Sequence, residues 1–294
     1  MPTSQMPLIS IIIPVKNEGD NVRSTITSLL NTRTTYPYEV IVVDDASTDN
    51  GCHFLQGHRQ NEKIKLITTE GIGAAAARNL GVNHARGNYF IFCDAHLSFE
   101  NFWIDRMMEL ILTKKADGVA PGIASMTEPH KIGYGQNLNQ KLEISWYPKP
   151  TGPAPVAILP GGCFLVTREA FMKVGGFDRG FRIWGFEDIE FSIKMWLFGY
   201  TCLVQPSVKI LHLFRQVHPY TIAHEHIYYN MLRMAYSHFN EQRIEAAKKL
   251  VLYANASEIA DDVLTCGAAA QRVRYTAQRK FDDNWFFQKF QIPF

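Results

Sequence analysis

One short segment, residues 90–96, constrains the fold of this chain more than any other. It reads Phe-Ile-Phe-Cys-Asp-Ala-His, an apolar run that predicts a buried strand and ends abruptly at Asp94 and His96. Open α/β sheets bind ligands at the carboxyl ends of their strands. Asp94 and His96 are two positions apart, so they point the same way in an extended chain. A carboxylate and an imidazole suit a divalent ion such as Mn²⁺ that also holds diphosphate oxygens, although a simple turn is the alternative.

Strands and helices are predicted to alternate around this segment. Short apolar, β-branched runs predict strands over residues 8–13, 38–43, 64–68 and 88–93. A helical stripe follows the first strand, and an alanine-rich helix begins after Gly71-Ile72-Gly73. This β-α-β-α-β pattern indicates an α/β fold with a mostly parallel sheet and crossover helices.

The pattern changes after residue 120. Residues 121–155 are rich in glycine and proline, and we expect an irregular segment over the site. Strands are predicted over residues 156–160 and 208–212, with helices between them. From residue 221 the pattern is helical, and the aromatic end should pack back on the body. We therefore expect a catalytic domain over residues 1–220 and a helical extension over residues 221–294.

Composition excludes several classes of protein. The 294 residues are 46% hydrophobic and 20% charged, with a net charge of +2 that gives no general attraction for nucleic acid. Five scattered cysteines without a C-x-x-C motif indicate reduced thiols. The polar start has no signal-peptide pattern, and no apolar run approaches the roughly 20 residues that span a bilayer. We expect a cytoplasmic protein without a transmembrane segment, with peripheral membrane contact left open.

Polar residues at the predicted strand and helix ends are candidates for ligand binding. Asp45 ends the second strand, where it either caps a turn or accepts hydrogen bonds from a nucleotide base or ribose. Arg78 is either a surface residue or a bidentate partner for a diphosphate. Gly161 and Gly162 form either a bend or a stretch of backbone that a sugar approaches closely. No G-x-G-x-x-G follows the first strand, which argues against a dinucleotide-binding dehydrogenase.

Two later segments combine acids, histidines and aromatic residues. Trp184-Gly185-Phe186-Glu187-Asp188 begins a helix, and its acids either cap the helix or bind sugar hydroxyls and take a proton. Residues 212–220 pack two histidines, an arginine and a tyrosine into nine positions, a dense set of donors for phosphate oxygens. A lone histidine such as His212 is more often a core residue, and its neighbours are what favour a ligand role.

Together these motifs resemble the family 2 glycosyltransferases of the GT-A fold. The resemblance rests on residues 13–18, residues 43–49, Ala77-Arg78-Asn79 and the D-x-H motif. The later half is similar to the polypeptide N-acetylgalactosaminyltransferases, which share D-x-H and an H-x-F-R-x-x-H-P-Y segment, here residues 212–220. Residues 8–220 are covered and the last 70 or so residues are not. The resemblance implies a GT-A, Rossmann-like catalytic domain that uses a UDP-sugar donor.

The resemblance also implies roles for individual residues. Around the uridine it places Pro14, Glu18 and Asp45, with Arg78 near the base or the diphosphate. It implies that Asp94, His96 and His212 bind Mn²⁺ (or Mg²⁺), and that this ion bridges the two phosphates. Over the diphosphate it places a mobile segment with Arg215, His218 and Tyr220. It also implies that the donor sugar and the acceptor are lined by Gly161, Gly162, Trp184, Glu187 and Asp188.

One departure from the N-acetylgalactosaminyltransferase pattern bears on the mechanism. Those enzymes carry W-G-G-E-N, whereas this chain has Phe186 in place of the second glycine and Asp188 in place of the asparagine. A Glu-Asp pair resembles inverting enzymes such as the β4-galactosyltransferases and chondroitin-type polymerases. A carboxylate can deprotonate an acceptor hydroxyl and an asparagine cannot, so we expect Asp188 to be the base of an inverting transfer. Phe186 adds bulk where the sugar or the acceptor would lie.

The sequence thus predicts a metal-dependent transferase of a hexose or N-acetylhexosamine from a UDP-sugar to an acceptor hydroxyl. A retaining enzyme of the N-acetylgalactosaminyl kind is the alternative, and a non-catalytic sugar-nucleotide-binding module is a more remote one. The acceptor is left open among a saccharide, a lipid-linked glycan and a peptide. For residues 221–294 we expect acceptor binding, pairing of two subunits in a homodimer, or contact with a membrane surface.

Overall fold

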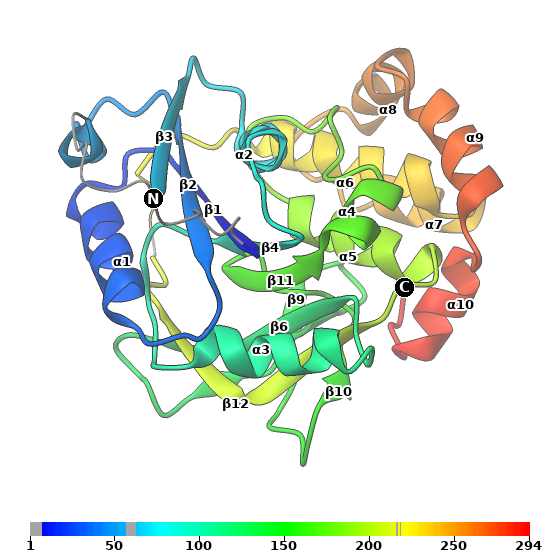
Figure 1. Ribbon diagram of the computed structural model, residues 1–294. Coiled ribbons are helices and arrows are strands. Elements are labelled where there is room, and N and C mark those ends of the chain that lie inside the picture. The colour runs from blue at the N-terminus through cyan, green and yellow to red at the C-terminus, as the bar shows by residue number, and fades with distance from the viewer. Residues whose placement is uncertain (1–7, 57–62, 216, 218) are drawn as a thin grey trace.

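The computed structural model describes residues 8–56, 63–215, 217 and 219–294, and its centre is one large sheet (Figure 1). Within the described chain the sheet has ten strands, eight of them in the order β10-β12-β6-β11-β4-β1-β2-β3. Its N-terminal half is parallel and contains β1 (Ile9–Val15), β2 (Tyr38–Asp45), β3 (Ile64–Thr69) and β4 (Tyr89–Cys93). Among its connections are α1 (Asp20–Asn31), the 3₁₀ turn η1 (His53–Leu55) and α2 (Ala74–Asn83). The predicted parallel sheet with crossover helices is confirmed.

The second half of the sheet is mixed. Strand β11 (Cys163–Thr167) runs antiparallel between β4 and β6 (Gly118–Ser125), and β12 (Cys202–His212) pairs in parallel with β6. Short strands extend this half of the sheet or form a separate ribbon; they are β5 (Leu97–Ser98), β7 (Ile132–Gly133), β8 (Gln136–Leu138), β9 (Ile144–Trp146) and β10 (Ala154–Pro155). The antiparallel β11 sets the end of β6 and β12 beside the end of β4.

Two expectations for the middle of the chain were wrong. The predicted irregular segment begins inside β6, which is buried along most of its length. Gly118 and Gly122 hide its strand pattern in the sequence, yet a Cβ atom at either position would come within 2.9 Å of a neighbouring side chain, so close packing requires glycine. Conversely, residues 156–160 are buried extended chain with one isolated bridge, between Ile158 and Gln136, and not a strand.

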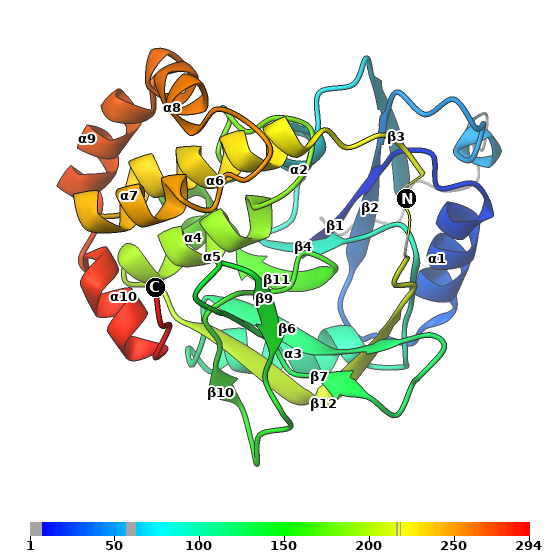
Figure 2. The same cartoon turned by 180° about the vertical axis from the view of Figure 1, so that it is seen from behind.

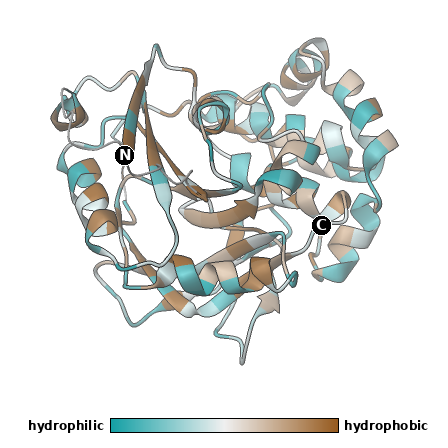
Figure 3. Cartoon of the chain, in the orientation of Figure 1, coloured by the Kyte–Doolittle hydropathy of each residue, from teal (hydrophilic) through white to brown (hydrophobic). Residues whose placement is uncertain are grey.

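Two hydrophobic layers cover the sheet, because successive strand residues point to opposite faces. Ile11 and Ile13 of β1 face α1 and α3 (Trp103–Leu112), whereas Ile12 faces the side that carries α2. On this second face also lie α4 (Arg168–Lys173) and α5 (Glu187–Leu197). The buried strands are accordingly mostly apolar, as the brown stretches in Figure 3 indicate, although Ser10 and Glu39 are buried as well.

The C-terminal helices form a third group, on the side of the molecule opposite α1 (Figures 1 and 2). They are α6 (His224–His238), α7 (Glu241–Lys248), α8 (Ala256–Thr265), α9 (Ala268–Gln278) and α10 (Asp283–Lys289). Phe286, Phe287 and Phe290 are buried, and the ring of Phe290 lies 5.1 Å from that of Trp196, so the aromatic end packs on α5. Among the described residues no helix is both long and apolar enough to cross a bilayer.

A fully buried ionic cluster ties α5 to the C-terminal helices. Glu190 lies 3.0 Å from the amine of Lys194 and 2.8 Å from Nε2 of His238, and no part of the three side chains is exposed. The ring of Tyr275 on α9 stacks on His238. Burial alone would raise the pKa of Glu190, but the charges and hydrogen bonds of Lys194 and His238 hold it below its usual value.

Removing the lysine of this cluster should destabilise the whole chain. In Lys194→Met the Glu190 carboxylate loses its permanent positive partner while it stays buried, which typically costs about 3–5 kcal/mol. The free energy of unfolding from urea titration measures the loss. Lys131→Met is the matched control, because Lys131 and Glu128 form an exposed pair, and solvent screens such pairs so that they contribute little to stability. If both variants lowered the free energy of unfolding equally, the stabilising role of the buried cluster would be contradicted.

Candidate functional site

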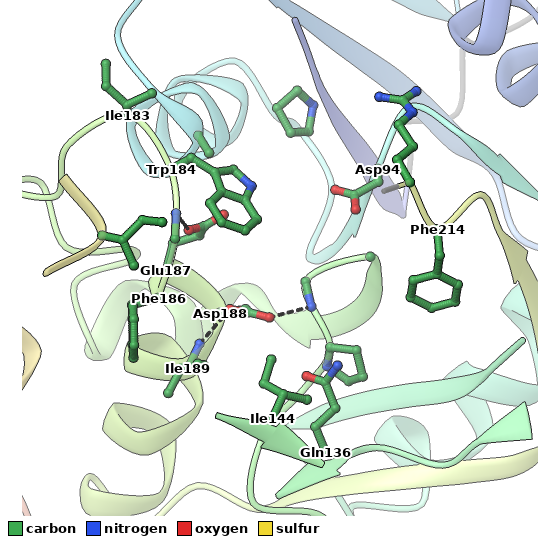
Figure 4. A pocket seen from close by; sticks show the side chains of 18 of the residues that line it. Asp94, Gln136, Ile144, Ile183, Trp184, Phe186, Glu187, Asp188, Ile189 and Phe214 are labelled. Carbon is green, nitrogen blue, oxygen red and sulfur yellow. Dashed lines mark hydrogen bonds between the residues drawn. The ribbon is translucent and has the colours of Figure 1, made fainter. Parts of the chain in front are cut away.

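A pocket with a volume of about 1000 Å³ lies where the parallel strands end. The ends of β1, β2, β4 and β12 contribute Pro14, Asp45, Asp94 and His212 to its lining. Its other walls come from the start of α5, the β8-β9 ribbon and the C-terminal helices. Figure 4 shows Asp94 and Asp188 as they line this pocket.

Asp94, His96 and His212 form the candidate metal centre. Each offers one ligand atom, and the three atoms lie within 4.8 Å of one another. His212 pairs with Leu97 in the sheet, which sets its ring 4.7 Å from that of His96 and its Nε2 3.3 Å from Asp94 Oδ2. One carboxylate and two imidazoles form a mixed oxygen and nitrogen ligand set that suits a divalent metal ion. The fold brings the three predicted ligands together although His96 and His212 are 116 positions apart in the sequence.

Local charges keep the Asp94 side chain ionised. Burial by itself would raise its pKa, but the hydrogen bond from His212 and the positive charges of His96, Arg78 and His212 hold the pKa far below its usual value. Glu18 accepts a hydrogen bond from His96 Nδ1 at 3.1 Å, which leaves Nε2 to face Asp94. Carboxylates that orient a histidine in this way are common around metal ligands.

Two glycines lie close to the acids and histidines of the site. A Cβ atom on Gly162 would come 3.0 Å from the His212 ring and 3.7 Å from Asp94 Oδ2. A Cβ atom on Gly161 would come 3.0 Å from Asp188 Oδ2, an oxygen that accepts a hydrogen bond from the Gly161 amide at 2.8 Å. Both predicted glycines therefore lie where a larger residue would displace a functional side chain.

Arg78 joins the metal centre to the start of α5. Its guanidinium is buried, 3.1 Å from Asp94 Oδ1 and 3.3 Å from Glu187 Oε1. The other Glu187 oxygen accepts a hydrogen bond from the Gly185 amide at 2.8 Å. Arg78 thus serves two protein carboxylates at the pocket wall, and a role toward a nucleotide stays a prediction.

Asp188, in the first turn of α5, has a carboxyl group with a raised pKa. Burial raises its pKa to about 6, and the neighbouring charge of Glu187 adds to the shift. The amides of Gly161 and Ile189 each donate one hydrogen bond to its oxygens, at 2.8 and 2.9 Å. An acid with this pKa is ionised at neutral pH and is basic enough to accept a proton.

The residues predicted around the uridine have partners within the protein. Asp45 is buried and accepts hydrogen bonds from the amides of Ile72 and Gly73, which shapes the loop before α2. Glu18 forms a bidentate ion pair with Arg215 in addition to its bond with His96. Burial would raise the pKa of Glu18, but His96 and Arg215 lower it below the usual value. The nucleotide roles of Pro14, Glu18, Asp45 and Arg215 stay predictions.

The segment after β12 reaches over the pocket. Tyr220 lines the pocket, and burial raises its pKa to about 12, to which the charges of Glu187 and Asp94 add. The Asn17 amide lies 3.5 Å from the Pro219 carbonyl, which connects this segment to the loop after β1. His218 was predicted to belong to the diphosphate clamp and lies outside the described residues.

Trp184 and its loop depend on a residue that the sequence analysis missed. Asn230 of α6 is fully buried, and its amide donates hydrogen bonds to the carbonyls of Arg182, Trp184 and Gly185. Its carbonyl accepts one from the Arg182 amide at 2.8 Å. The sequence does contain one clue to this role. Asn230 lies inside a predicted helix beside its apolar stripe, and an asparagine is unfavourable there unless its side chain forms hydrogen bonds.

Family models place the chain among sugar transferases. Residues 10–175 match glycosyl transferase family 2, and residues 147–223 match the N-terminal domain of galactosyltransferase. Polypeptide N-acetylgalactosaminyltransferase 11 of Xenopus tropicalis is 28% identical over 263 residues, which are 81% of this chain and 44% of the relative. Polypeptide N-acetylgalactosaminyltransferase 8 of Drosophila melanogaster is 30% identical over 238 residues, 73% of this chain and 39% of the relative. The chain thus spans less than half the length of these relatives.

Solved structures share the fold. GalNAc-T7 with UDP, GalNAc and Mn²⁺ superposes with a TM-score of 0.72 at 19% identity, over 98% of this chain and 57% of that one. S. aureus TarS 1-349 in complex with UDP-GlcNAc gives 0.58 at 17% identity, over 90% of this chain and 74% of that one. The expected GT-A fold is therefore confirmed. Because the family 2 model covers more than half of its residues, the chain belongs to glycosyl transferase family 2.

Proposed function

We propose that this chain transfers a hexose or an N-acetylhexosamine from a UDP-sugar to an acceptor hydroxyl with the help of a divalent metal ion. The observation that carries the proposal is a metal-ligand cluster and an acid with a raised pKa that line one pocket and are linked through Arg78 and Glu187. The relatives named as N-acetylgalactosaminyltransferases and the neighbour solved with UDP, GalNAc and Mn²⁺ support a UDP-sugar donor.

The metal centre accounts for the leaving group. Asp94, His96 and His212 would hold Mn²⁺ (or Mg²⁺), which when bound supplies positive charge to the departing diphosphate. Arg215 and His218 are proposed to approach the diphosphate from the segment after β12, and Arg215 must first leave Glu18 to do so. Pro14, Asp45 and Arg78 complete the proposed nucleotide site.

Asp188 accounts for the nucleophile. Its carboxylate would accept the proton of the acceptor hydroxyl while the oxygen attacks the anomeric carbon on the face opposite the diphosphate, which inverts the configuration. Gly161, Gly162, Trp184 and Glu187 are proposed to line the sugar and the acceptor, with Glu187 held in place by Arg78 and Gly185. The match of residues 147–223 to a galactosyltransferase domain favours this Glu-Asp arrangement.

A retaining enzyme of the N-acetylgalactosaminyl kind is the second candidate, and the similarity to relatives named as polypeptide N-acetylgalactosaminyltransferases is its support. In that case Asp188 only positions the acceptor. The anomeric configuration of the product, read by NMR, separates the two candidates. A non-catalytic sugar-nucleotide-binding module would release no UDP from any donor. A cytoplasmic location and a homodimer through the C-terminal helices stay predictions.

Metal dependence is tested by calorimetric titration with UDP, with and without Mn²⁺. UDP should bind at least tenfold more tightly with Mn²⁺, and His212→Ala should abolish this gain because one ligand is lost. Gly162→Ala should weaken it as well, since the new Cβ atom would press on the His212 ring. Gly152→Ala is the matched control, because a Cβ atom there meets nothing within 4 Å. UDP binding that ignores Mn²⁺ and His212→Ala would refute the metal site.

The pH dependence of transfer tests the base. Because burial raises the pKa of Asp188 to about 6, the ionised form that accepts a proton is lost as the pH falls below 6. The value of kcat/KM should then drop about tenfold per pH unit. Asp188→Asn should lower kcat about 10²–10⁴-fold and remove this acid limb. The exposed Asp20→Asn is the control. Near-normal turnover in Asp188→Asn would show that the base is another group.

A further inference from the structure

Exposed apolar side chains gather at one part of the catalytic pocket. Ile144 is 41% exposed, Trp146 38%, Phe214 50% and Leu252 71%, and all four line the pocket. They come from the β8-β9 ribbon, from the segment after β12 and from the connection after α7, which are far apart in the sequence. Large apolar side chains that stay exposed next to a pocket are typical of a binding surface.

This apolar lining extends from beside Asp94 to beyond Asp188. In Figure 4, Phe214 lies on the side of Asp94, whereas Phe186 and Ile189 lie on the side of Asp188 away from Asp94. Helix α6 and the connection after α7 add further apolar side chains to the lining. We call the following six residues the acceptor wall: Ile144, Trp146, Phe186, Ile227, Leu250 and Leu252.

Two large apolar residues of the pocket lining have strained backbone conformations. Ile183 has a φ of 39° and Phe186 a φ of 66°, and both line the pocket. Only glycine adopts this left-handed region without cost, and bulky or β-branched residues there are rare and cluster at functional sites. The loop is fixed by the Ala74 amide, which donates a hydrogen bond to the Ile183 carbonyl at 2.7 Å, and by Asn230.

Trp146 is also held in a defined position. A Cβ atom on Gly133, in the neighbouring β7, would come within 2.3 Å of the indole ring. The indole therefore lies directly on the backbone of β7, and the ribbon presents it as a fixed surface. Its ring lies 6.3 Å from that of Phe214, which follows the ligand His212.

The chemistry of the wall identifies what part of an acceptor it binds. Five of the six residues, all except Trp146, have aliphatic or phenyl side chains without polar atoms. The same elements also contribute five polar residues to the pocket lining: Gln136, Lys141, Glu143, Tyr228 and Lys249. A bare saccharide needs a hydrogen-bond partner for most of its hydroxyls, because a buried unpaired hydroxyl is costly. Apart from the indole N–H of Trp146, the side chains of the acceptor wall offer no such partners, so the wall itself favours an alkyl or isoprenoid chain over a bare saccharide.

We propose that the acceptor is amphiphilic, a sugar whose apolar aglycone lies on the acceptor wall while its hydroxyl faces Asp188. A lipid-linked glycan has this chemistry. The inference rests on the proposed function and narrows the acceptor from the three classes that the sequence left open. An aglycone bound on the acceptor wall would lie next to the catalytic site, because the wall includes Phe186, two residues before the proposed base Asp188.

A chain-length series of glycosides tests the proposal. The donor is the UDP-sugar that a screen for Mn²⁺-dependent UDP release identifies. Monosaccharides are then added as methyl, butyl and octyl glycosides, below their micelle concentrations, and the concentration that half-maximally changes UDP release is measured. It should fall about fourfold for each methylene that the wall covers. Equal values for the three aglycones, or no effect of any glycoside, would overturn the proposal.

Variants of the wall locate the effect. Leu252→Ser and Ile144→Ser change exposed side chains, and each should flatten the chain-length dependence measured within the same variant. Val273→Ser is the matched control, because Val273 is 71% exposed on α9 and does not line the pocket; it should keep the full dependence. An unchanged dependence in both wall variants would overturn the proposal.

Two further outcomes separate this inference from the proposed function. Faster transfer to a threonine peptide with polar flanking residues than to any octyl glycoside would overturn the amphiphilic acceptor but leave the transferase intact. Absence of Mn²⁺-dependent UDP release from every UDP-sugar would overturn the proposed function and this inference with it.

Discussion

A single buried guanidinium holds the site together. Arg78 on α2 reaches Asp94 at the end of β4 and Glu187 at the start of α5, two acids that are 93 residues apart in the sequence. Asp188 is adjacent to Glu187, so the buried cation offsets the repulsion among three neighbouring carboxyl groups of the pocket lining. The same side chain therefore contacts one candidate metal ligand, Asp94, and the acid next to the candidate base, Glu187.

The mixed topology of the sheet places the remaining groups. Strand β11 runs antiparallel beside β4, so Gly162 lies opposite Asp94. Because Gly162 has no side chain, it leaves room for the ring of His212. Strand β12 returns in parallel to β6 and pairs at its end with β5, which sets His212 beside His96. A purely parallel sheet would bring strand ends to this edge but would not bring a glycine turn into the metal centre.

Much of this could be predicted from the sequence, because short motifs at strand ends are local. Asp94 and His96 follow an apolar strand, and the H-x-F-R segment follows another, so fold family and ligand set could be inferred. What could not be predicted depends on distant partners. The contacts of Glu18 with His96 and Arg215 could not be read from the sequence, and β6 looked irregular because close packing against neighbouring side chains requires its glycines. An asparagine inside a helix hinted that Asn230 has a task, but not which loop it fixes.

The buried cluster of Glu190, Lys194 and His238 bears on how the chain unfolds. Helix α5 carries Glu187, Asp188 and Glu190 in its first turn and Lys194 in its last, so one helix belongs both to the pocket and to the interface with α6. Local opening of the C-terminal helices would expose charged groups that have no other partners nearby. Such an opening is costly, and the pocket and the C-terminal helices should exchange their amide hydrogens together, as one cooperative unit.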